Sequence, residues 1–320
     1  WNELEPQARA ALLQRPAVAD DAGIRKDTAS IVAEVRATGD AALRALTTRL
    51  DRATVTNIKV SDAELAAAAD ALSAAQVQAI DVAIANVRRF HEAQMPSAIR
   101  VETAPGVVCE KLSHALDAVG LYVPAGTAPL PSAAVMLAVP AAIAGCPTRV
   151  LCTPPRPDGS ADPAVLVAAS RAGVRDIYKV GGAQAIAAMA YGTETIPRVS
   201  KIFGPGNAWV TCAKSLVSAD AAGAAIDMPA GPSEVLVIAD ATASPEFVAA
   251  DLLSQAEHGV DSQVVLVTTN ESMASAVAQE LDAQLAQLSR ADIAAGALEH
   301  SRIVIVDNLQ TAVLISNEYA

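Results

Sequence analysis

The run Val199-Ser200-Lys201-Ile202-Phe203 is followed directly by Gly204-Pro205-Gly206-Asn207, and this change of pattern decides the fold. The first part is typical of a short strand, and the second is typical of a turn that leads into a helix. The same order recurs along the chain, with further strands expected at residues 120–123, 149–152, 176–180, 234–239, 263–268 and 302–306. Apolar strands that are joined by helices form parallel sheets covered on both faces, so the sequence predicts an α/β protein.

The region before residue 119 has a different pattern. Apolar residues at helical spacing predict two helical segments, with Gly39-Asp40 between them. Ser61-Asp62-Ala63-Glu64 is a capping box, in which the Ser and Glu side chains satisfy free amides at the start of a helix. We expect this helix to run to about Gln94. Pro105-Gly106 lies between two β-type segments and predicts a hairpin.

Length and composition exclude several classes of protein. A chain of 320 residues is long enough for about two domains, and 52% hydrophobic residues exclude a disordered chain. The net charge of −12 repels phosphate backbones and disfavours binding to nucleic acid, so we expect no nucleic-acid partner. The longest stretch without a polar side chain, residues 133–146, is too short to cross a bilayer, and the N-terminus carries no signal pattern. We therefore expect a soluble cytoplasmic protein without a membrane partner.

Three glycine-containing loops follow expected strands. They are Tyr122-Val123-Pro124-Ala125-Gly126-Thr127, Gly181-Gly182-Ala183-Gln184 and Gly204-Pro205-Gly206-Asn207. Ligands of doubly wound sheets bind at the carboxyl ends of strands, where glycine lets the backbone approach and helix amides suit a phosphate. Each loop could also be an ordinary turn, and Trp209 stands where a GxGxxG motif has its third glycine. Three such loops together favour a nucleotide-sized ligand.

Two further segments are candidates for binding a substrate or a metal. The Pro/Gly-rich segment 226–234 would present Ser233 from a rigid loop, or would only be a tight loop with solvated side chains. Asp251, Gln255 and His258 have the spacing i, i+4, i+7 in a helix expected over residues 245–258, so they share one face. A histidine in the last helical turn also interacts well with the helix dipole, and Gln is an uncommon zinc ligand. The spacing alone therefore leaves metal binding open.

At these segments the sequence resembles the histidinol dehydrogenase family, and the resemblance extends from Trp1 to Ala320. Its most specific parts are Ile226-Asp227-Met228-Pro229-Ala230-Gly231-Pro232-Ser233-Glu234 and Ser254-Gln255-Ala256-Glu257-His258-Gly259. It also includes Gly120-Leu121-Tyr122-Val123-Pro124, Gly181-Gly182-Ala183-Gln184-Ala185-Ile186-Ala187 and Phe203-Gly204-Pro205-Gly206-Asn207. Ala125 is a small departure, since many relatives have Gly there.

The resemblance implies the last step of histidine biosynthesis, in which L-histidinol is oxidised through an aldehyde to L-histidine while two NAD⁺ are reduced. The residues it implies for NAD binding are Tyr122, Gln184 and Asn207. Those implied for substrate binding are Ser233, Gln255 and His258, of which Gln255 and His258 would also bind zinc. The enzyme would be a homodimer.

The resemblance also implies the domain organisation. We expect two doubly wound, Rossmann-like parallel-sheet domains, one inserted in the other. The first would combine residues 16–121 with residues 234–320, and the inserted NAD-binding domain would span residues 122–233. Residues 1–15 would form an N-terminal helical arm.

The end of the chain departs from the family pattern. In the family, a Glu-His pair that acts as acid and base follows the segment matched here by Asn317-Glu318-Tyr319. The remaining zinc ligands, an Asp and a His, lie further on, and the last comes from a tail that crosses to the partner subunit. We therefore expect a chain truncated at its C-terminus, with no catalytic acid or base within residues 1–320 and no activity as given.

Two alternatives remain. The chain could belong to a dehydrogenase of another small polyol on the same scaffold, such as a sulfopropanediol. It could also be a ligand-binding relative without catalysis, which would agree with the missing Glu-His pair.

Overall fold

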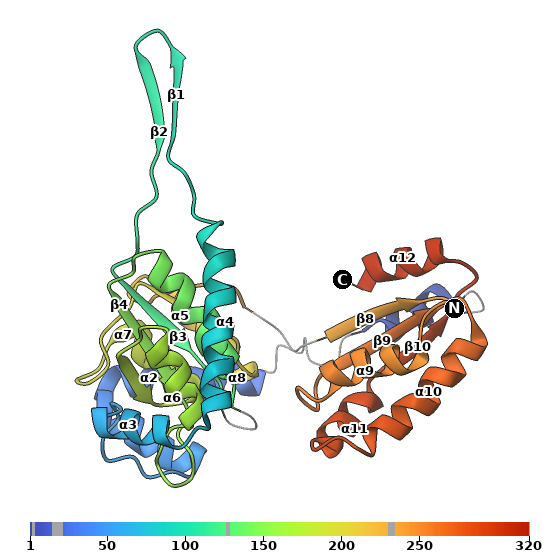
Figure 1. Cartoon of the computed structure of the whole chain (residues 1–320), viewed down its shortest axis with the longest axis horizontal. Coiled ribbons are helices and arrows are strands. Elements are labelled where there is room, and N and C mark those ends of the chain that lie inside the picture. The colour runs from blue at the N-terminus through green and yellow to red at the C-terminus, as the bar shows by residue number, and fades with distance from the viewer. Residues whose placement is uncertain (2–3, 15–21, 126–128, 230–233, 320) are drawn as a thin grey trace. The chain divides into compact units, whose positions relative to one another are not determined.

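The computed structural model describes residues 1, 4–14, 22–125, 129–229 and 234–319. The chain forms two compact units, which are described separately (Figure 1). The larger unit is Asp21–Ala230, and the smaller unit combines Trp1–Asp20 with Gly231–Ala320. The larger unit is thus inserted between two segments of the smaller one. Among the described residues, no helix is both long and apolar enough to cross a membrane.

The described part of the larger unit contains a parallel sheet with the strand order β5-β4-β3-β6-β7. Its strands are β3 (Ala118–Tyr122), β4 (Thr148–Thr153), β5 (Asp176–Lys179), β6 (Lys201–Phe203) and β7 (Ala225–Ile226). The chain starts at the central strand β3, moves outward through β4 and β5, and returns to the other side of β3 with β6. The order therefore reverses between β3 and β6, which is where doubly wound sheets bind ligands.

Helices cover both faces of this sheet, and each face has its own apolar core (Figure 1). On one face lie α2 (Ala22–Leu46), α7 (Gly182–Tyr191) and α8 (Ala208–Ala219). On the other lie α3 (Asp62–Asp70), α4 (Ala74–Glu92), α5 (Pro131–Ile143) and α6 (Pro163–Arg171). Ala, Val, Ile and Leu make up most of both cores, and this arrangement confirms the doubly wound α/β prediction for the larger unit.

The helices before the sheet differ in detail from the predicted ones. A kink at Gly39 interrupts α2, and a π-helical turn, η1 (Thr47–Asp51), follows it. The capping box of Ser61 and Glu64 forms as predicted. The single helix expected from it to about Gln94 is instead two helices, because Ser73 begins a second capping box with Gln76.

The predicted hairpin consists of β1 (Ile99–Ala104) and β2 (Val107–Lys111). Its residues are exposed, and the hairpin projects from the rest of the larger unit (Figure 1).

The described part of the smaller unit holds a second parallel sheet, with the order β10-β9-β8. Its strands are β8 (Glu234–Ala239), β9 (Gln263–Thr268) and β10 (Arg302–Ile305). One face packs on α9 (Pro245–Ala256), α10 (Glu271–Leu285) and α11 (Ala291–Glu299). The other packs on α12 (Leu309–Tyr319) and on residues at the end of α1 (Pro6–Leu12). This sheet too is covered on both faces.

The structure corrects the predicted domain boundaries. Residues 16–121 were expected in one domain with residues 234–320, but residues 21–121 belong to the larger unit. The reason is packing: the apolar stripe of α2, with Ile31, Val35, Leu43 and Leu46, is buried in one core with α7 and α8. The expected arm, residues 1–15, contains α1, and Leu12 packs on the smaller unit's core.

Candidate functional site

The carboxyl end of β3 lies beside the turn that follows β6. Leu121 of β3 pairs with Phe203 of β6, so Tyr122 and Gly204 are neighbours at the point where the strand order reverses. Gly204 has φ of 126°, and a Cβ at this position would come 2.2 Å from the backbone oxygen of Tyr122. Glycine is therefore required for the turn to approach β3 so closely. Two of the three predicted loops are brought together here.

An ion pair between a buried lysine and Asp227 holds this turn in place. The N–H of Gly204 donates to Oδ2 of Asp227 (2.9 Å), and the oxygen of Gly204 accepts from Nζ of Lys214 (2.9 Å). Lys214 also pairs with Asp227 and is 2% exposed. Burial alone would raise the pKa of Asp227, but hydrogen bonds from Lys214 and from Gly204 outweigh it and hold that pKa below its usual value. Asp227 is therefore ionised at neutral pH and fixes the Gly204 backbone.

Asn207 begins the helix that follows the turn. Its Oδ1 accepts from the N–H of Val210 (3.1 Å), which makes Asn207 the N-cap of α8. The residue is exposed. Because capping uses only Oδ1, the carboxamide nitrogen can donate to a ligand at the helix N-terminus.

Tyr122 and Gln184 lie in a buried polar cluster. The Oη of Tyr122 accepts from the N–H of Gly182 (3.0 Å), which connects the end of β3 with the start of α7. Gln184 is 1% exposed, and its Nε2 donates to Oδ2 of Asp51 (3.1 Å). Its Oε1 is shut off from solvent and accepts no hydrogen bond from any residue that the structure describes. A buried acceptor without a donor costs free energy, so the cluster is incomplete on the Oε1 side.

Burial also changes the proton affinities of this cluster. It raises the pKa of Asp51 to about 6, although the hydrogen bond from Gln184 acts in the opposite direction. Burial raises the pKa of Tyr122, and the nearby Asp51 charge raises it further. The phenol is therefore neutral at physiological pH, whereas Asp51 changes charge near the lower end of the physiological pH range.

The predicted substrate and metal residues lie in the smaller unit, apart from Ser233, which is outside the described residues. Helix α9 ends at Ala256 and not at His258, because Glu257 caps it and the N–H of His258 bonds back to the Gln255 oxygen (3.1 Å). His258 is exposed in this turn, and Gln255 is half-buried, with no acceptor for its Nε2 among the described residues. The described parts of the chain contain no group of three or more His, Cys, Asp or Glu that could hold a metal ion.

Comparison with known proteins gives the same family along the whole chain. The sequence model of the family described as histidinol dehydrogenase matches residues 13–320. The chain belongs to the histidinol dehydrogenase family. The Xanthomonas campestris pv. campestris (strain ATCC 33913) histidinol dehydrogenase is 58% identical over 320 residues, which are 100% of this chain and 74% of that protein. The Vibrio parahaemolyticus histidinol dehydrogenase is 54% identical over 319 residues, 73% of its length.

A solved structure of the histidinol dehydrogenase family agrees in fold. The crystal structure of histidinol dehydrogenase from Elizabethkingia anophelis has a TM-score of 0.91 and 45% identity, covering 99% of this chain and 72% of that one. These findings confirm the predicted family and the predicted Rossmann-like α/β fold, and they place the chain among oxidoreductases of histidine biosynthesis.

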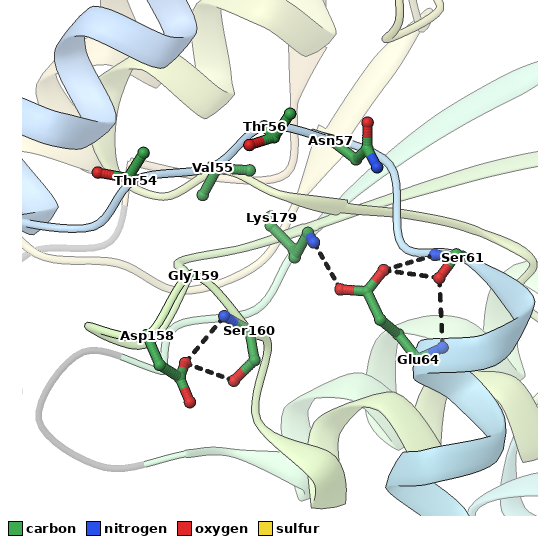
Figure 2. A pocket seen from close by; sticks show the side chains of 10 residues that line it. All are labelled: Thr54, Val55, Thr56, Asn57, Ser61, Glu64, Asp158, Gly159, Ser160 and Lys179. Carbon is green, nitrogen blue, oxygen red and sulfur yellow. Dashed lines mark hydrogen bonds and ion pairs between the residues drawn. The ribbon is translucent and has the colours of Figure 1, made fainter.

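This histidinol dehydrogenase family member also has a polar pocket that the sequence did not predict (Figure 2). It has a volume of about 420 Å³ and lies in the larger unit between residues 54–64 and residues 158–160. Buried Lys179 pairs there with Glu64 (2.5 Å), which also accepts from Ser61 (2.9 Å). Asp158 accepts from Ser160. These polar groups bind one another, and none of the predicted site residues lines the pocket.

Proposed function

We propose that the chain binds NAD⁺ and L-histidinol for the two-step oxidation of L-histidinol to L-histidine. The observation that carries this proposal is the close approach of the Gly204 turn to Tyr122 at the reversal of strand order, in a chain that matches histidinol dehydrogenases along its length. In doubly wound folds this is the position of a dinucleotide site.

The residues at this edge fit NAD⁺. Gly204 lets the turn after β6 lie directly against the backbone of Tyr122, and Asn207 has a carboxamide nitrogen available beside the N-terminus of α8. The buried Oε1 of Gln184 needs a hydrogen-bond donor. NAD⁺, when bound, accepts a hydride in each of the two oxidations. The tasks of Tyr122, Gln184 and Asn207 are to bind it and to orient it.

The overall reaction balances with two equivalents of NAD⁺. Oxidation of the alcohol to the aldehyde releases one hydride and one proton. Addition of water to the aldehyde and loss of a second hydride give the carboxylate with two further protons. Each step needs a positioned base, because an alcohol or an aldehyde hydrate gives up a hydride only as its hydroxyl proton leaves. The chain's net charge of −12 suits a cationic substrate such as histidinol.

We infer that zinc binds at Gln255 and His258 and that Ser233 contacts the substrate. Oxygen and imidazole nitrogen are both zinc ligands, so the two residues fit two of about four positions of a zinc site. Zinc, when bound, orients the imidazole and amino groups of the substrate.

The quaternary state and the location follow from the family resemblance. We infer a homodimer in the cytoplasm, with no nucleic-acid or membrane partner. The acidic net charge supports the exclusion of nucleic acid.

The proposal is tested by measuring NAD⁺ binding and histidinol-dependent NADH formation by the purified chain with zinc. We expect binding, weakened by Asn207→Ala without loss of the fold, because this exposed residue contributes little packing. We expect turnover at least about 100-fold below that of the Xanthomonas campestris relative, since each positioned proton-transfer group contributes about 10²–10⁴-fold. Turnover equal to that relative would place the acid and base within residues 1–320. Absence of NAD⁺ binding would contradict the proposed function.

A further inference from the structure

Asp51 is a charged member of the buried cluster that the sequence did not single out. It is the last residue of η1, and the Gln184 it contacts lies 133 residues later in the chain. The hydrogen bond runs from Nε2 of Gln184 to Oδ2 of Asp51, at 3.1 Å. Asp51 thus reaches a residue of the proposed cofactor site from a different part of the larger unit.

This contact determines which atom of Gln184 is left for a ligand. A carboxylate only accepts hydrogen bonds, so it pairs with the NH₂ side of a carboxamide and turns the oxygen away. The oxygen, Oε1, lies over Gly182, where a Cβ would come within 2.7 Å of it. The phenol of Tyr122 bonds to the N–H of the same glycine. Around Gly182 the cluster therefore combines an acceptor, Oε1, with a phenol that can donate.

We propose that Asp51 is a positioning residue of this site: its carboxylate holds the Gln184 carboxamide with Oε1 toward the bound dinucleotide, and protonation of Asp51 removes that preference. The proposal rests on the proposed NAD⁺ site. A protonated carboxyl can donate to Oε1, which allows the carboxamide to turn and present NH₂ instead. The favoured ligand group is then a hydrogen-bond donor of the dinucleotide, either a ribose hydroxyl or a carboxamide N–H.

The surroundings of Asp51 allow this switch to act within the accessible pH range. Burial raises the pKa of Asp51 to about 6. Of the titratable groups that face the cluster from the sheet, Tyr122 on β3 and Cys152 on β4 both have a pKa raised by burial, so neither ionises near neutral pH. On Asp51's own side, Arg49 is directed to Glu34 (3.8 Å) and Arg52 is exposed. From α7 the cluster receives only the neutral Gln184 and the Gly182 backbone.

The affinity for NAD⁺ should rise with pH. Above the Asp51 pKa the carboxylate favours Oε1 toward the ligand, so NAD⁺ binds tightly. Below it the preference is lost, and one hydrogen bond to the ligand is lost with it. A hydrogen bond of this kind corresponds to about a tenfold change in affinity.

The experiment is calorimetric titration of NAD⁺ into the whole chain at several pH values between about 5 and 8. We expect wild-type affinity to fall about tenfold as the pH is lowered through about 6. Asp51→Asn removes the charge with little change of shape and should give a weaker affinity that does not vary with pH. Asp81→Asn is the matched control, because Asp81 is an exposed carboxylate that pairs with Arg171 on another face of the unit, and its profile should equal that of wild type.

A second variant keeps the test decisive if Asp51→Asn does not fold. Gln184→Met keeps the size of the side chain but has no carboxamide, so NAD⁺ affinity should lose its pH dependence although Asp51 is present. A wild-type profile in Asp51→Asn or Gln184→Met would overturn the role of Asp51, and the proposed function would still stand if Asn207→Ala weakened binding. Absence of NAD⁺ binding at every pH would overturn both proposals.

Discussion

Gly204 combines a left-handed backbone with a close approach to a neighbouring strand. At φ of 126° an L side chain is strained, and its Cβ would also meet the Tyr122 oxygen at 2.2 Å. Lys214 and Asp227 already hold the backbone around Gly204, so it cannot move away without breaking its hydrogen bonds to this ion pair. The turn can therefore lie against β3 only because residue 204 is a glycine and has no Cβ.

Gly204→Ala should therefore destabilise the protein and weaken NAD⁺ binding. We expect a loss of about 3 kcal/mol in the free energy of unfolding, from backbone strain and steric overlap together. Gly106→Ala is the control: Gly106 also has a positive φ (79°), but nothing lies within 4 Å of a Cβ there, so strain alone should cost about 1 kcal/mol. Urea unfolding measures both. Equal losses would show that the contact with Tyr122 is unimportant.

At the scale of elements, α2 is joined to the segment after α7 through its kink. At Gly39 a Cβ would come 2.3 Å from Oε2 of Glu194, and the same oxygen accepts from the N–H of Asp40 (2.7 Å). The buried carboxylate of Asp40 accepts from the hydroxyls of Thr193 (2.7 Å) and Thr195. The kink thus brings both the N–H and the carboxylate of Asp40 into hydrogen-bonding distance of residues 193–195.

The Asp40 contact should contribute stability that depends on pH. Burial alone would raise the pKa of Asp40, but hydrogen bonds from Thr195 and Thr193 outweigh it and hold the pKa below the ordinary 3.8. A carboxyl with a lowered folded-state pKa stabilises the protein above its unfolded-state value and loses that effect as the pH falls through the folded-state value. Asp40→Asn should thus cost about 2 kcal/mol near neutral pH and progressively less below about pH 4.

Unfolding by urea at neutral and at acid pH measures this difference. Asp70→Asn makes the same change of charge at an exposed position of α3 and should change stability little at either pH. A cost for Asp40→Asn that is equal at both pH values would mean that ionisation of Asp40 contributes nothing.

Local sequence patterns were sufficient for most elements and for part of the site. Strands β8 and β9 have the predicted bounds, whereas β7 is only two residues long and too short to leave a pattern. The stripe on α2 showed that this helix is buried but not which unit buries it. For the site, parallel topology predicted that Tyr122 and Asn207 lie at one edge of a sheet. It did not reveal Asp51, whose partner is 133 residues away.

Lys214 was missed for a related reason. A lysine on a helix is usually solvated, and only the structure shows that this one is buried under the Gly204 turn. A sequence signal did exist for its partner, since Asp227 lies in the segment with the most specific resemblance to the family. That segment does not indicate that Asp227 acts through a backbone turn.

At the scale of the whole molecule, the chain has two parallel-sheet units, and the proposed tasks are divided between them. The residues proposed for NAD⁺ lie in the larger unit, and Gln255 and His258 lie in the smaller unit. The larger unit contains the apolar cores on both faces of its sheet. It also contains the contacts that fix the Gly204 turn and Gln184. The NAD⁺ site should therefore be built from the larger unit's residues.

Hydrogen exchange of the whole chain with and without NAD⁺ tests this central claim most directly, because it locates the bound cofactor on the sequence. The account predicts slower exchange on NAD⁺ addition in peptides that contain residues 122–125, 181–184 and 204–210, together with the end of η1 at Asp51. Peptides of the exposed hairpin, residues 99–111, should exchange equally in both conditions. Binding of NAD⁺ without protection at residues 181–184 and 204–210 would contradict the account.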